Sequence, residues 1–163
     1  MTMKLILMRH AKSDWSFDLQ DHERPLNKRG RRSAKALGDW LRAQGHLPDQ
    51  VLCSTAKRTR ETLDLLNLDA PAQFDRALYH AGPETLMEVL QDATGDCVLM
   101  LGHNPGIAFF AGALLSAPPE HDRFDHYPTG ATLVAAFDQD SWKDTKPGAG
   151  RALDFVVPRE LLS

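Results

Sequence analysis

Two histidines and two arginines in this sequence follow apolar runs of the kind that form buried strands. With the run that each follows, they are Arg9 and His10 after 5–8, Arg58 after 51–53 and His103 after 97–101. The carboxyl ends of neighbouring parallel strands meet at one edge of a sheet, which is where such sheets bind their ligands. We therefore expect these four side chains to meet in one crevice, with no acidic residue among them.

Side chains of these types suit the transfer of a phosphoryl group. The transferred group carries negative charge on its oxygens, so its catalysts work mainly by positioning and by stabilising charge. Arg9 and Arg58 would supply guanidinium forks that stay charged and bind phosphate oxygens. One imidazole would attack phosphorus through a neutral nitrogen, while the other donates a hydrogen bond to the phosphoryl oxygens. The start of the helix expected after Asn104 would add backbone N–H donors.

Alternating strand and helix patterns are expected to position this set. Strands are expected at 5–8, 51–53, near 74, 97–101, 132–137 and 152–157. Helices are expected after Asn27 as N-cap, after Ser54 and Thr55 as caps, at Pro83 and after Asn104. This order predicts an α/β fold, a three-layer αβα sandwich in which a mostly parallel sheet carries helices on both faces.

Length and composition indicate one globular domain over residues 1–163. Hydrophobic residues make up 42% of the chain and charged residues 25%, which suffices for a core and excludes a disordered chain. The formal net charge is −3, whereas a surface for nucleic acid or an anionic membrane needs a strong cationic excess. We therefore expect no nucleic-acid or membrane partner. The oligomeric state is left open.

The two cysteines indicate a reducing compartment. Cys53 and Cys97 each lie in an apolar run, where a buried thiol is the usual state, and they form no C-x-x-C motif. Residues 1–8 contain too few apolar residues for a signal peptide, and the apolar stretch 107–115 is too short to span a bilayer. These features predict a soluble, cytoplasmic protein.

Three blocks of sequence carry a resemblance to a known family. They are 7–13 (LMRHAKS), 54–62 (STAKRTRET) and 101–106 (LGHNPG), with 24–27 (RPLN), Arg29 and Gly30 as a further block. In residue types, order and approximate spacing they resemble the histidine phosphatase superfamily, which has the phosphoglycerate mutase-like fold. The fourth block is similar to its small SixA-like branch of phosphohistidine phosphatases.

The resemblance implies a role for each residue of the set. It implies His10 as the nucleophile, Arg9 and Arg58 as phosphate ligands, and His103 as the second histidine of the phosphate pocket. Apart from the resemblance, Ser13 would add a hydrogen bond to phosphate or only order the loop. No metal or organic cofactor is implied, and the substrate would be a phosphorylated histidine of a protein or a small phosphate metabolite.

Two departures from the family pattern bear on the reaction. Ala11 stands where the family usually has glycine, which adds one methyl group. The region 78–82 holds no carboxylate, although larger relatives have there an acid that protonates the leaving oxygen; the next acid is Glu84. An alkoxide leaves poorly without a proton donor, whereas an imidazole, which titrates near neutrality, leaves more readily. The missing acid therefore favours phosphohistidine over a phosphate ester.

Other interpretations remain open beside this one. A phosphomonoesterase of the same superfamily would act on a small ester, and a non-catalytic module would bind a phospholigand without turning it over. A cysteine phosphatase loop, C-x5-R, would start at Cys53, but Thr59 occupies the position of its arginine. A metal site at His121 and His126 lacks helical spacing, so a polar loop is the better interpretation.

Further residues are candidates for the rim of the site. Trp15 and Arg24 would line the substrate entrance or pack the loop on the first helix, and His80 would be a substitute proton donor. The remaining histidines are interpreted as surface or loop residues: His22, His46, His121 and His126.

Overall fold

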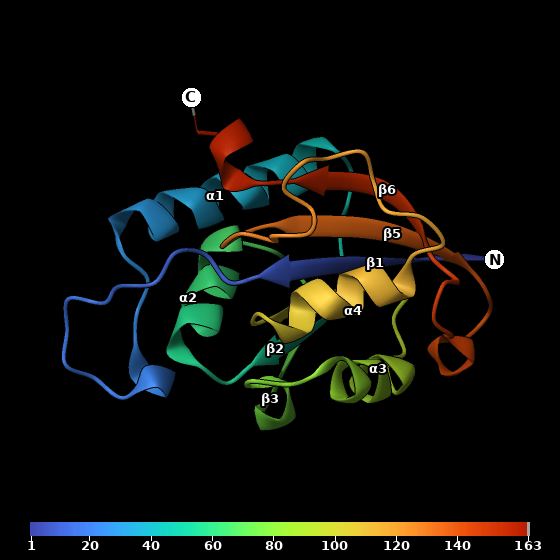
Figure 1. Cartoon of the computed structure of the whole chain (residues 1–163), viewed down its shortest axis with the longest axis horizontal. Helices are drawn as coiled ribbons and strands as arrows, with labels where there is room; N and C mark the ends of the chain where they lie inside the picture. Colours follow the sequence, from blue (N-terminus) through green and yellow to red (C-terminus); the bar gives the residue numbers. More distant parts are fainter. Residues whose placement is uncertain (163) are drawn as a thin grey trace.

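Six strands form one sheet in this computed structural model, which describes residues 1–162 (Figure 1). The strands are β1 (Thr2–Arg9), β2 (Gln50–Ser54), β3 (Ala72–Asp75), β4 (Cys97–Gly102), β5 (Thr132–Asp138) and β6 (Arg151–Val156). Their order across the sheet is β3-β2-β4-β1-β5-β6. Strands β3, β2, β4 and β1 pair in parallel, and β5 is antiparallel to both β1 and β6. The prediction of a mostly parallel sheet is confirmed.

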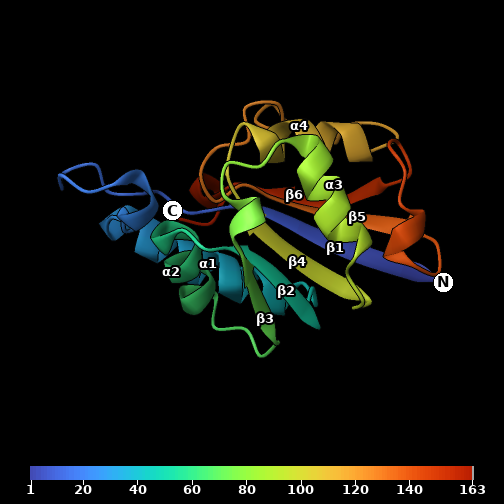
Figure 2. The ribbon, with the colours of Figure 1, turned by 90° about the horizontal axis from the view of Figure 1, so that it is seen from below.

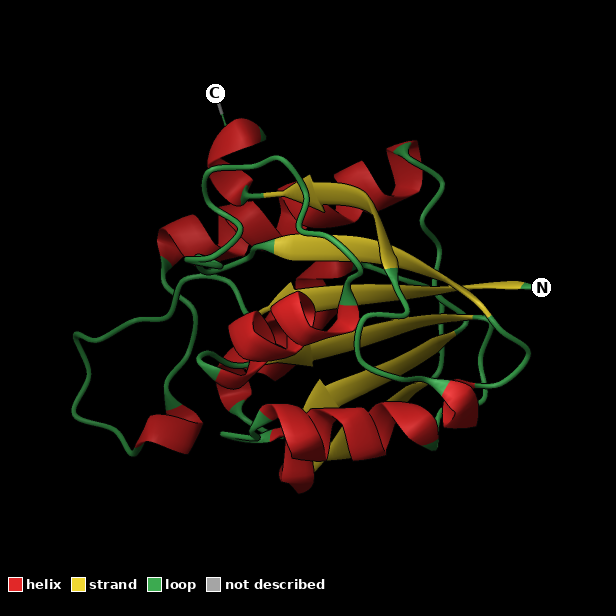
Figure 3. Ribbon diagram, turned by 45° about the vertical axis from the view of Figure 1, so that its right-hand side comes forward, coloured by secondary structure: helices red, strands yellow, loops and turns green. Residues whose placement is uncertain are grey.

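Four helices cover the two faces of the sheet (Figures 2 and 3). They are α1 (Lys28–Ala43), α2 (Lys57–Leu66), α3 (Pro83–Gln91) and α4 (Gly106–Leu114). Alternate residues of β1 serve opposite faces: Ile6 packs with α1 and α2, whereas Leu5 packs with α3 and α4. A strand buried on both faces needs apolar residues at consecutive positions, which explains the continuous apolar run. The three-layer αβα prediction is confirmed.

Helix ends follow the capping residues in most places. The side chain of Asn27 accepts a hydrogen bond from the Gly30 N–H at the start of α1, as predicted. Gly45, with a φ of 74°, follows its end. Pro83 occupies the first turn of α3 after the N-cap Gly82. These local choices set the lengths of the helices and hence where the loops at the sheet edge begin.

The predicted caps of α2 are wrong. The N-cap is Ala56, and no side chain caps this helix. The Ser54 hydroxyl instead lies 2.8 Å from Nε2 of His103, and the Thr55 hydroxyl lies 2.9 Å from Nε2 of His22. Both hydroxyls therefore face the carboxyl edge of the sheet.

The segment between β1 and α1 extends beyond the carboxyl ends of the strands (blue in Figure 1). Two backbone hydrogen bonds close its base, from Asp14 N–H to the Pro25 carbonyl and from Asn27 N–H to the Lys12 carbonyl. Gly30 of α1 lies against the same place, because a Cβ there would come within 2.1 Å of the Lys12 carbonyl oxygen. These contacts hold the two ends of the segment together against the first turn of α1.

Two further observations concern membrane-spanning helices and the cysteines. Within residues 1–162, no helix is long and apolar enough to cross a membrane. Cys53 and Cys97 are buried and free, as expected. Burial raises the pKa of the Cys53 thiol to about 12 and that of Cys97 to about 11, so neither is a thiolate at neutral pH.

Candidate active site

The carboxyl ends of β1 and β4 and the first turn of α2 surround a cavity of about 330 Å³. All seven residues named as site candidates line it: Arg9, His10, Ser13, Arg24, Arg58, His80 and His103. The rings of His10 and His103 are 5.3 Å apart between centroids. The expectation that Arg9, His10, Arg58 and His103 meet in one crevice is therefore confirmed.

His10 is held in one orientation by its backbone and its ring. Its N–H donates to the Gly102 carbonyl and its carbonyl accepts from the Gly130 N–H. Nδ1 lies 2.7 Å from the Ala11 carbonyl oxygen, which only accepts, so Nδ1 carries the proton. Burial, followed by the charges of Arg9 and Arg58, lowers the pKa of His10 to about 3. At neutral pH, Nε2 therefore keeps an unprotonated lone pair suited to nucleophilic attack.

The methyl group of Ala11 has its own place in the core. Its side chain is fully buried and packs with Leu26 and Ala34. Its N–H donates to the Thr62 hydroxyl, 3.1 Å away. The core thus accommodates the extra methyl group beside His10.

His103 is 4% exposed and is oriented by Ser54. Burial, followed by the neighbouring His10 and Arg58, lowers the pKa of His103 to about 2. A neutral imidazole has one N–H and one lone pair. If Nε2 accepts from the Ser54 hydroxyl, Nδ1 carries the N–H, and if Nε2 donates to it, Nδ1 carries the lone pair. Sequence reasoning assigned Ser54 to a helix cap and missed this contact.

Three buried side-chain nitrogens within residues 1–162 have no hydrogen-bond partner. They are Arg9 Nε, Arg58 Nε and His103 Nδ1. Leaving a buried polar atom unpaired costs free energy, about 1–3 kcal/mol per group, and such atoms are uncommon in folded proteins. All three belong to residues that line one cavity.

Asp21 contradicts the expectation that no acidic residue lies in the crevice. Its carboxylate accepts hydrogen bonds from Arg24 at 3.0 Å and from Arg58 at 3.0 Å, and its carbonyl accepts another from Arg58 at 2.7 Å. Hydrogen bonds from Tyr79, Arg24 and Arg58 outweigh its desolvation and hold the pKa of the carboxyl well below its usual range. Asp21 precedes the quoted block at 24–27 by three residues, and this D-x-x-R spacing was the only signal available.

Tyr79 and His80 close the side of the cavity next to His103. The rings of Tyr79 and His80 are stacked with centroids 4.0 Å apart, and both meet His103 edge-on. Nε2 of His80 lies 3.2 Å from the Asp21 carboxylate, and its side chain is 57% exposed. His80 is therefore a rim residue that faces both solvent and the cavity, while Tyr79 was not foreseen.

Arg24 and Trp15 also line the cavity. Arg24 is 5% exposed, and its guanidinium lies 3.4 Å from the centroid of the Trp15 ring, a cation–π contact. It also donates to the Ser13 hydroxyl at 2.6 Å. Trp15 is 76% exposed, so it covers Arg24 without being buried itself. Both residues line the cavity, and their role as the substrate entrance stays a prediction.

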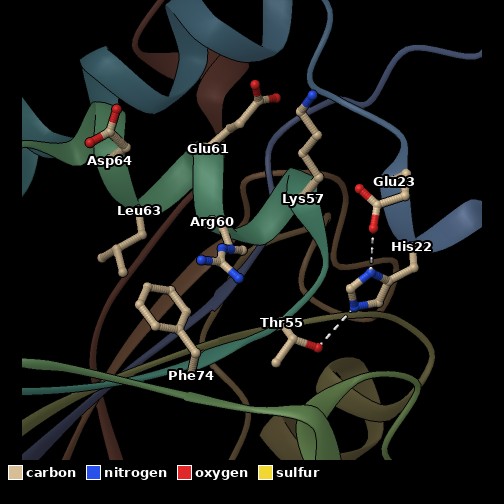
Figure 4. Close-up of a pocket in the computed structure, with 9 residues that line it drawn as sticks. All are labelled: His22, Glu23, Thr55, Lys57, Arg60, Glu61, Leu63, Asp64 and Phe74. Atoms are coloured by element: carbon tan, nitrogen blue, oxygen red, sulfur yellow. Dashed lines mark hydrogen bonds and ion pairs between the residues drawn. The ribbon is translucent and has the colours of Figure 1, made fainter.

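A larger cavity of about 540 Å³ is lined by His22, the residue that follows Asp21 in the chain (Figure 4). His22 bridges Thr55 and Glu23 there, and its ring packs edge-on against Tyr79 with centroids 4.9 Å apart. The charged residues around this cavity are of both signs: Lys57, Arg60, Glu23, Glu61 and Asp64. It holds none of the four predicted catalytic residues.

The other histidines differ in their burial. His46 is not a surface residue: it is 7% exposed and lies between the Lys4 ammonium and the Asp154 carboxylate. His121 is half-buried and contacts Glu160 at 2.7 Å, whereas His126 is exposed. Within residues 1–162, no group of three or more His, Cys, Asp or Glu side chains is arranged to hold a metal ion.

Comparison with known proteins gives concordant results. Residues 5–81 match the family model of the histidine phosphatase superfamily (branch 1). An uncharacterised protein of Mycobacterium tuberculosis H37Rv is 39% identical over 160 residues, which cover 93% of this chain and all of that protein. The solved structure of a candidate phosphohistidine phosphatase SixA from Nakamurella multipartitia is 31% identical, with a TM-score of 0.85 and 97% of each chain covered.

A protein histidine phosphatase SixA solved with tungstate shares the fold. Its TM-score is 0.79 at 23% identity, with 98% of this chain and 99% of that chain covered.

Proposed function

The chain belongs to the SixA-like branch of the histidine phosphatase superfamily, and on that premise we propose that it hydrolyses protein phosphohistidine through a phosphorylated His10. Membership supports a phosphatase in general. The protein phosphohistidine substrate, the covalent intermediate and the residue roles are our proposal. We also keep the cytoplasm as its predicted location.

The observation that carries the proposal is the set of unpaired nitrogens around His10. Arg9 Nε, Arg58 Nε and His103 Nδ1 are buried donors or acceptors without a partner, and the cavity that they share also holds the nucleophile. Preorganised donors of this kind stabilise the charge that builds up on phosphoryl oxygens during transfer. They support a site for a phosphoryl group rather than for a neutral ligand.

In the proposed first step, Nε2 of His10 attacks phosphorus. The new bond joins His10 Nε2 to phosphorus, and the bond from phosphorus to the substrate imidazole breaks. If the other nitrogen of that imidazole is protonated, the ring leaves as a neutral histidine and needs no proton from the enzyme. The hydrogen bond from His10 Nδ1–H to Ala11 keeps the proton on Nδ1 throughout.

In the proposed second step, water attacks the phosphorylated His10. The bond from phosphorus to Nε2 breaks, inorganic phosphate forms, and His10 returns as a neutral ring because Nδ1 has kept its proton. Arg9 and Arg58 would hold the phosphoryl oxygens through both steps. The same groups therefore serve transfer to His10 and transfer to water.

Asp21 supports a phosphoramidate as the preferred substrate. Among the described residues it is the one carboxylate lining the cavity, and its pKa is held well below the usual range by Tyr79, Arg24 and Arg58. An ionised carboxylate has no proton to give to a leaving alkoxide, whereas a leaving imidazole needs none.

One observation favours the second candidate, a small-molecule phosphomonoesterase. His80 lies at the rim with Nε2 beside Asp21, which is the arrangement of a histidine that donates a proton while a carboxylate orients it. Such a pair would assist an alkoxide leaving group.

A hydrolysis panel separates the candidates. We expect phosphohistidine peptides to be hydrolysed at least about a hundredfold faster, in kcat/KM, than serine phosphate and glycerol phosphate, with His10→Ala inactive on both. The panel is run with a chelator, since the arginines supply the positive charge that metal ions supply elsewhere. Faster ester hydrolysis that depends on His80 would favour the phosphomonoesterase. Phospholigand binding without any hydrolysis would favour a non-catalytic module.

A further inference from the structure

Another cavity, distinct from that of Figure 4, opens directly beside the catalytic one. It measures about 430 Å³ and shares Lys12 and Thr129 with the catalytic cavity. Arg29 reaches it from the first turn of α1, Arg123 from the loop before β5, and Arg159 from the segment after β6. Three separate parts of the chain thus contribute a cation to one hollow that borders the site of His10.

The cations of this hollow have no partner. Within residues 1–162, no ion pair or side-chain hydrogen bond is found for Lys12, Arg29, Arg123 or Arg159. Arg123 is half-buried, and the other three are exposed. Two carboxylates also line the hollow. Glu160 is occupied by His121 and by the Val157 N–H, and Asp122 is 94% exposed.

The charge balance of the hollow is therefore opposite to that of the chain. Four cations face two carboxylates there, while the whole chain carries a formal charge of −3. The cavity of Figure 4 makes a useful contrast, because its two cations are matched by three carboxylates: Glu23, Glu61 and Asp64. A local excess of unpaired positive charge on an acidic protein selects for an anion.

The fold fixes this hollow relative to the nucleophile. Lys12 is two residues beyond His10, and its backbone carries the first turn of α1, because Gly30 lies against the Lys12 carbonyl. Arg29 is the residue before Gly30. Lys12 and Arg29 are thus held near His10 by direct packing of backbone against backbone.

From this arrangement we infer that the hollow formed by Lys12, Arg29, Arg123 and Arg159 is a second anion-binding subsite. It takes a second anionic group, a phosphate or a carboxylate, that the substrate carries beside the phosphoryl group being transferred. This inference rests on the proposed function, and it narrows the substrate class to molecules with at least two anionic groups. Such a group belongs either to a small molecule or to an acidic residue beside the phosphohistidine of a protein.

Two pairs of probes test the subsite and distinguish these sources. The first pair is a phosphohistidine peptide with glutamates near the phosphorylated residue and the same peptide with glutamines. The second pair is a series of alkane bisphosphonates and the matching monophosphonates, used as competitive inhibitors of phosphohistidine hydrolysis. Arg29→Gln and Arg159→Gln are compared with Lys35→Gln, since Lys35 is exposed on α1 and lines neither cavity.

In at least one pair, we expect the wild-type protein to prefer the probe with two anionic groups about tenfold. The preference is measured as kcat/KM for the peptides and as the inhibition constant for the phosphonates. Each arginine variant should reduce that preference about threefold to fivefold, as is usual for one solvent-accessible ion pair, and high salt should reduce it as well. Lys35→Gln should keep the preference. A preference in the peptide pair alone identifies an acidic protein segment, and one in the bisphosphonates alone identifies a small molecule.

Hydrolysis of both peptides at equal rates, with equal inhibition by both phosphonates, would overturn the subsite and leave the proposed function intact. An equal loss of preference in Lys35→Gln would also overturn it, because the effect would then be general attraction. Absence of hydrolysis of either peptide would instead contradict the proposed function, and the phosphonates, read out by binding, would still decide the subsite.

Discussion

At the scale of single residues, the candidate site depends on where His10 holds its proton. The Ala11 carbonyl oxygen accepts from Nδ1, so that nitrogen is the donor and Nε2 has the lone pair. Burial and two neighbouring arginines hold the pKa of His10 at about 3. The ring is therefore neutral at physiological pH, so no general base is needed to remove a proton from Nε2 before it attacks.

Asp21 is the residue whose role is least expected. Its carboxylate contacts Arg24 and Arg58, which are the side chains that a phosphate oxygen would also contact. A carboxylate and a phosphoryl group compete for such donors, because both are anions whose oxygens accept paired hydrogen bonds. We therefore expect Asp21 to set how strongly the site holds phosphate.

Asp21→Asn should strengthen inhibition by inorganic phosphate. The amide still accepts one hydrogen bond but no longer carries the charge that competes with phosphate for Arg58. We expect the inhibition constant for phosphate to fall about fivefold, in line with the loss of one partly exposed ion pair. The measurement is phosphate inhibition of hydrolysis at pH 7.

Asp18→Asn is the matched control, since Asp18 is exposed in the same segment and lines none of the cavities described here. Weaker or unchanged phosphate inhibition in Asp21→Asn would show that Asp21 orients the arginines rather than competing for them.

The sequence predicted part of this site. Arg9, His10, Arg58 and His103 were predicted from their places after apolar runs, and the structure brings them together. Asp21 was not predicted, because it lies in a segment without periodicity whose return path depends on long-range contacts. Ser54 was misinterpreted, because a hydroxyl before a helix has the same local pattern whether it caps the helix or contacts a distant histidine.

At the scale of elements, the contact between α1 and the segment after β1 determines where the nucleophile loop lies. Gly30 allows the helix to touch the Lys12 carbonyl, where a Cβ would come within 2.1 Å. The opposing atom belongs to the backbone and has little freedom to move aside. Any larger residue must therefore displace the helix or the loop.

We predict opposite effects for two glycine-to-alanine changes. Gly30→Ala should lower the free energy of unfolding by about 1–3 kcal/mol, because of overpacking, and should reduce turnover by shifting the loop. Gly112→Ala should raise the free energy of unfolding by about 0.5–1 kcal/mol, since a Cβ at Gly112 meets nothing within 4 Å and alanine favours the helix. Urea denaturation measures both. Equal stability of the two variants would mean that the loop yields without cost.

The elements themselves were predicted with uneven success. Buried strands such as β4 (Cys97–Gly102) have an apolar run that only a sheet buried on both faces explains. The edge strand β3 is short and exposed, so its sequence carries little signal beyond Phe74. The order of strands across the sheet has no local signature at all, because parallel pairing joins residues far apart in the chain.

At the scale of the whole molecule, the two site histidines make stability depend on pH. The pKa values of His10 and His103 fall from 6.5 to about 3 and about 2 on folding. Between these values the unfolded chain binds more protons than the folded one, so stability rises with pH. Asp21, whose carboxyl has a lowered pKa, contributes in the same direction only below about pH 4.

We therefore predict that the protein loses stability as the pH falls from 6.5 to 4.5. The loss should be up to about 1.4 kcal/mol per histidine for each pH unit, because one unit of pKa corresponds to that free energy. Thermal unfolding at several pH values measures it, and His103→Gln should flatten the dependence. His126→Gln, at an exposed position, serves as the control. A flat profile in the wild-type protein would contradict the buried neutral state of both rings.

The prediction of one domain over residues 1–163 stays a prediction, as does the absence of a cofactor. The four predicted catalytic residues come from three separated segments of the chain. The sheet must be intact to bring these segments together, so the proposed phosphatase site depends on the fold of the whole molecule.

The most direct test of the central claim is to trap the phosphorylated enzyme. Rapid quenching in base during turnover of a labelled phosphohistidine peptide should leave label on the protein, and that label should be lost in acid, as expected for a phosphoramidate. Peptide mapping should place it on His10, and His10→Ala should carry no label and show no turnover. Label that persists in His10→Ala or maps to His103, or hydrolysis without any labelled enzyme, would contradict the account.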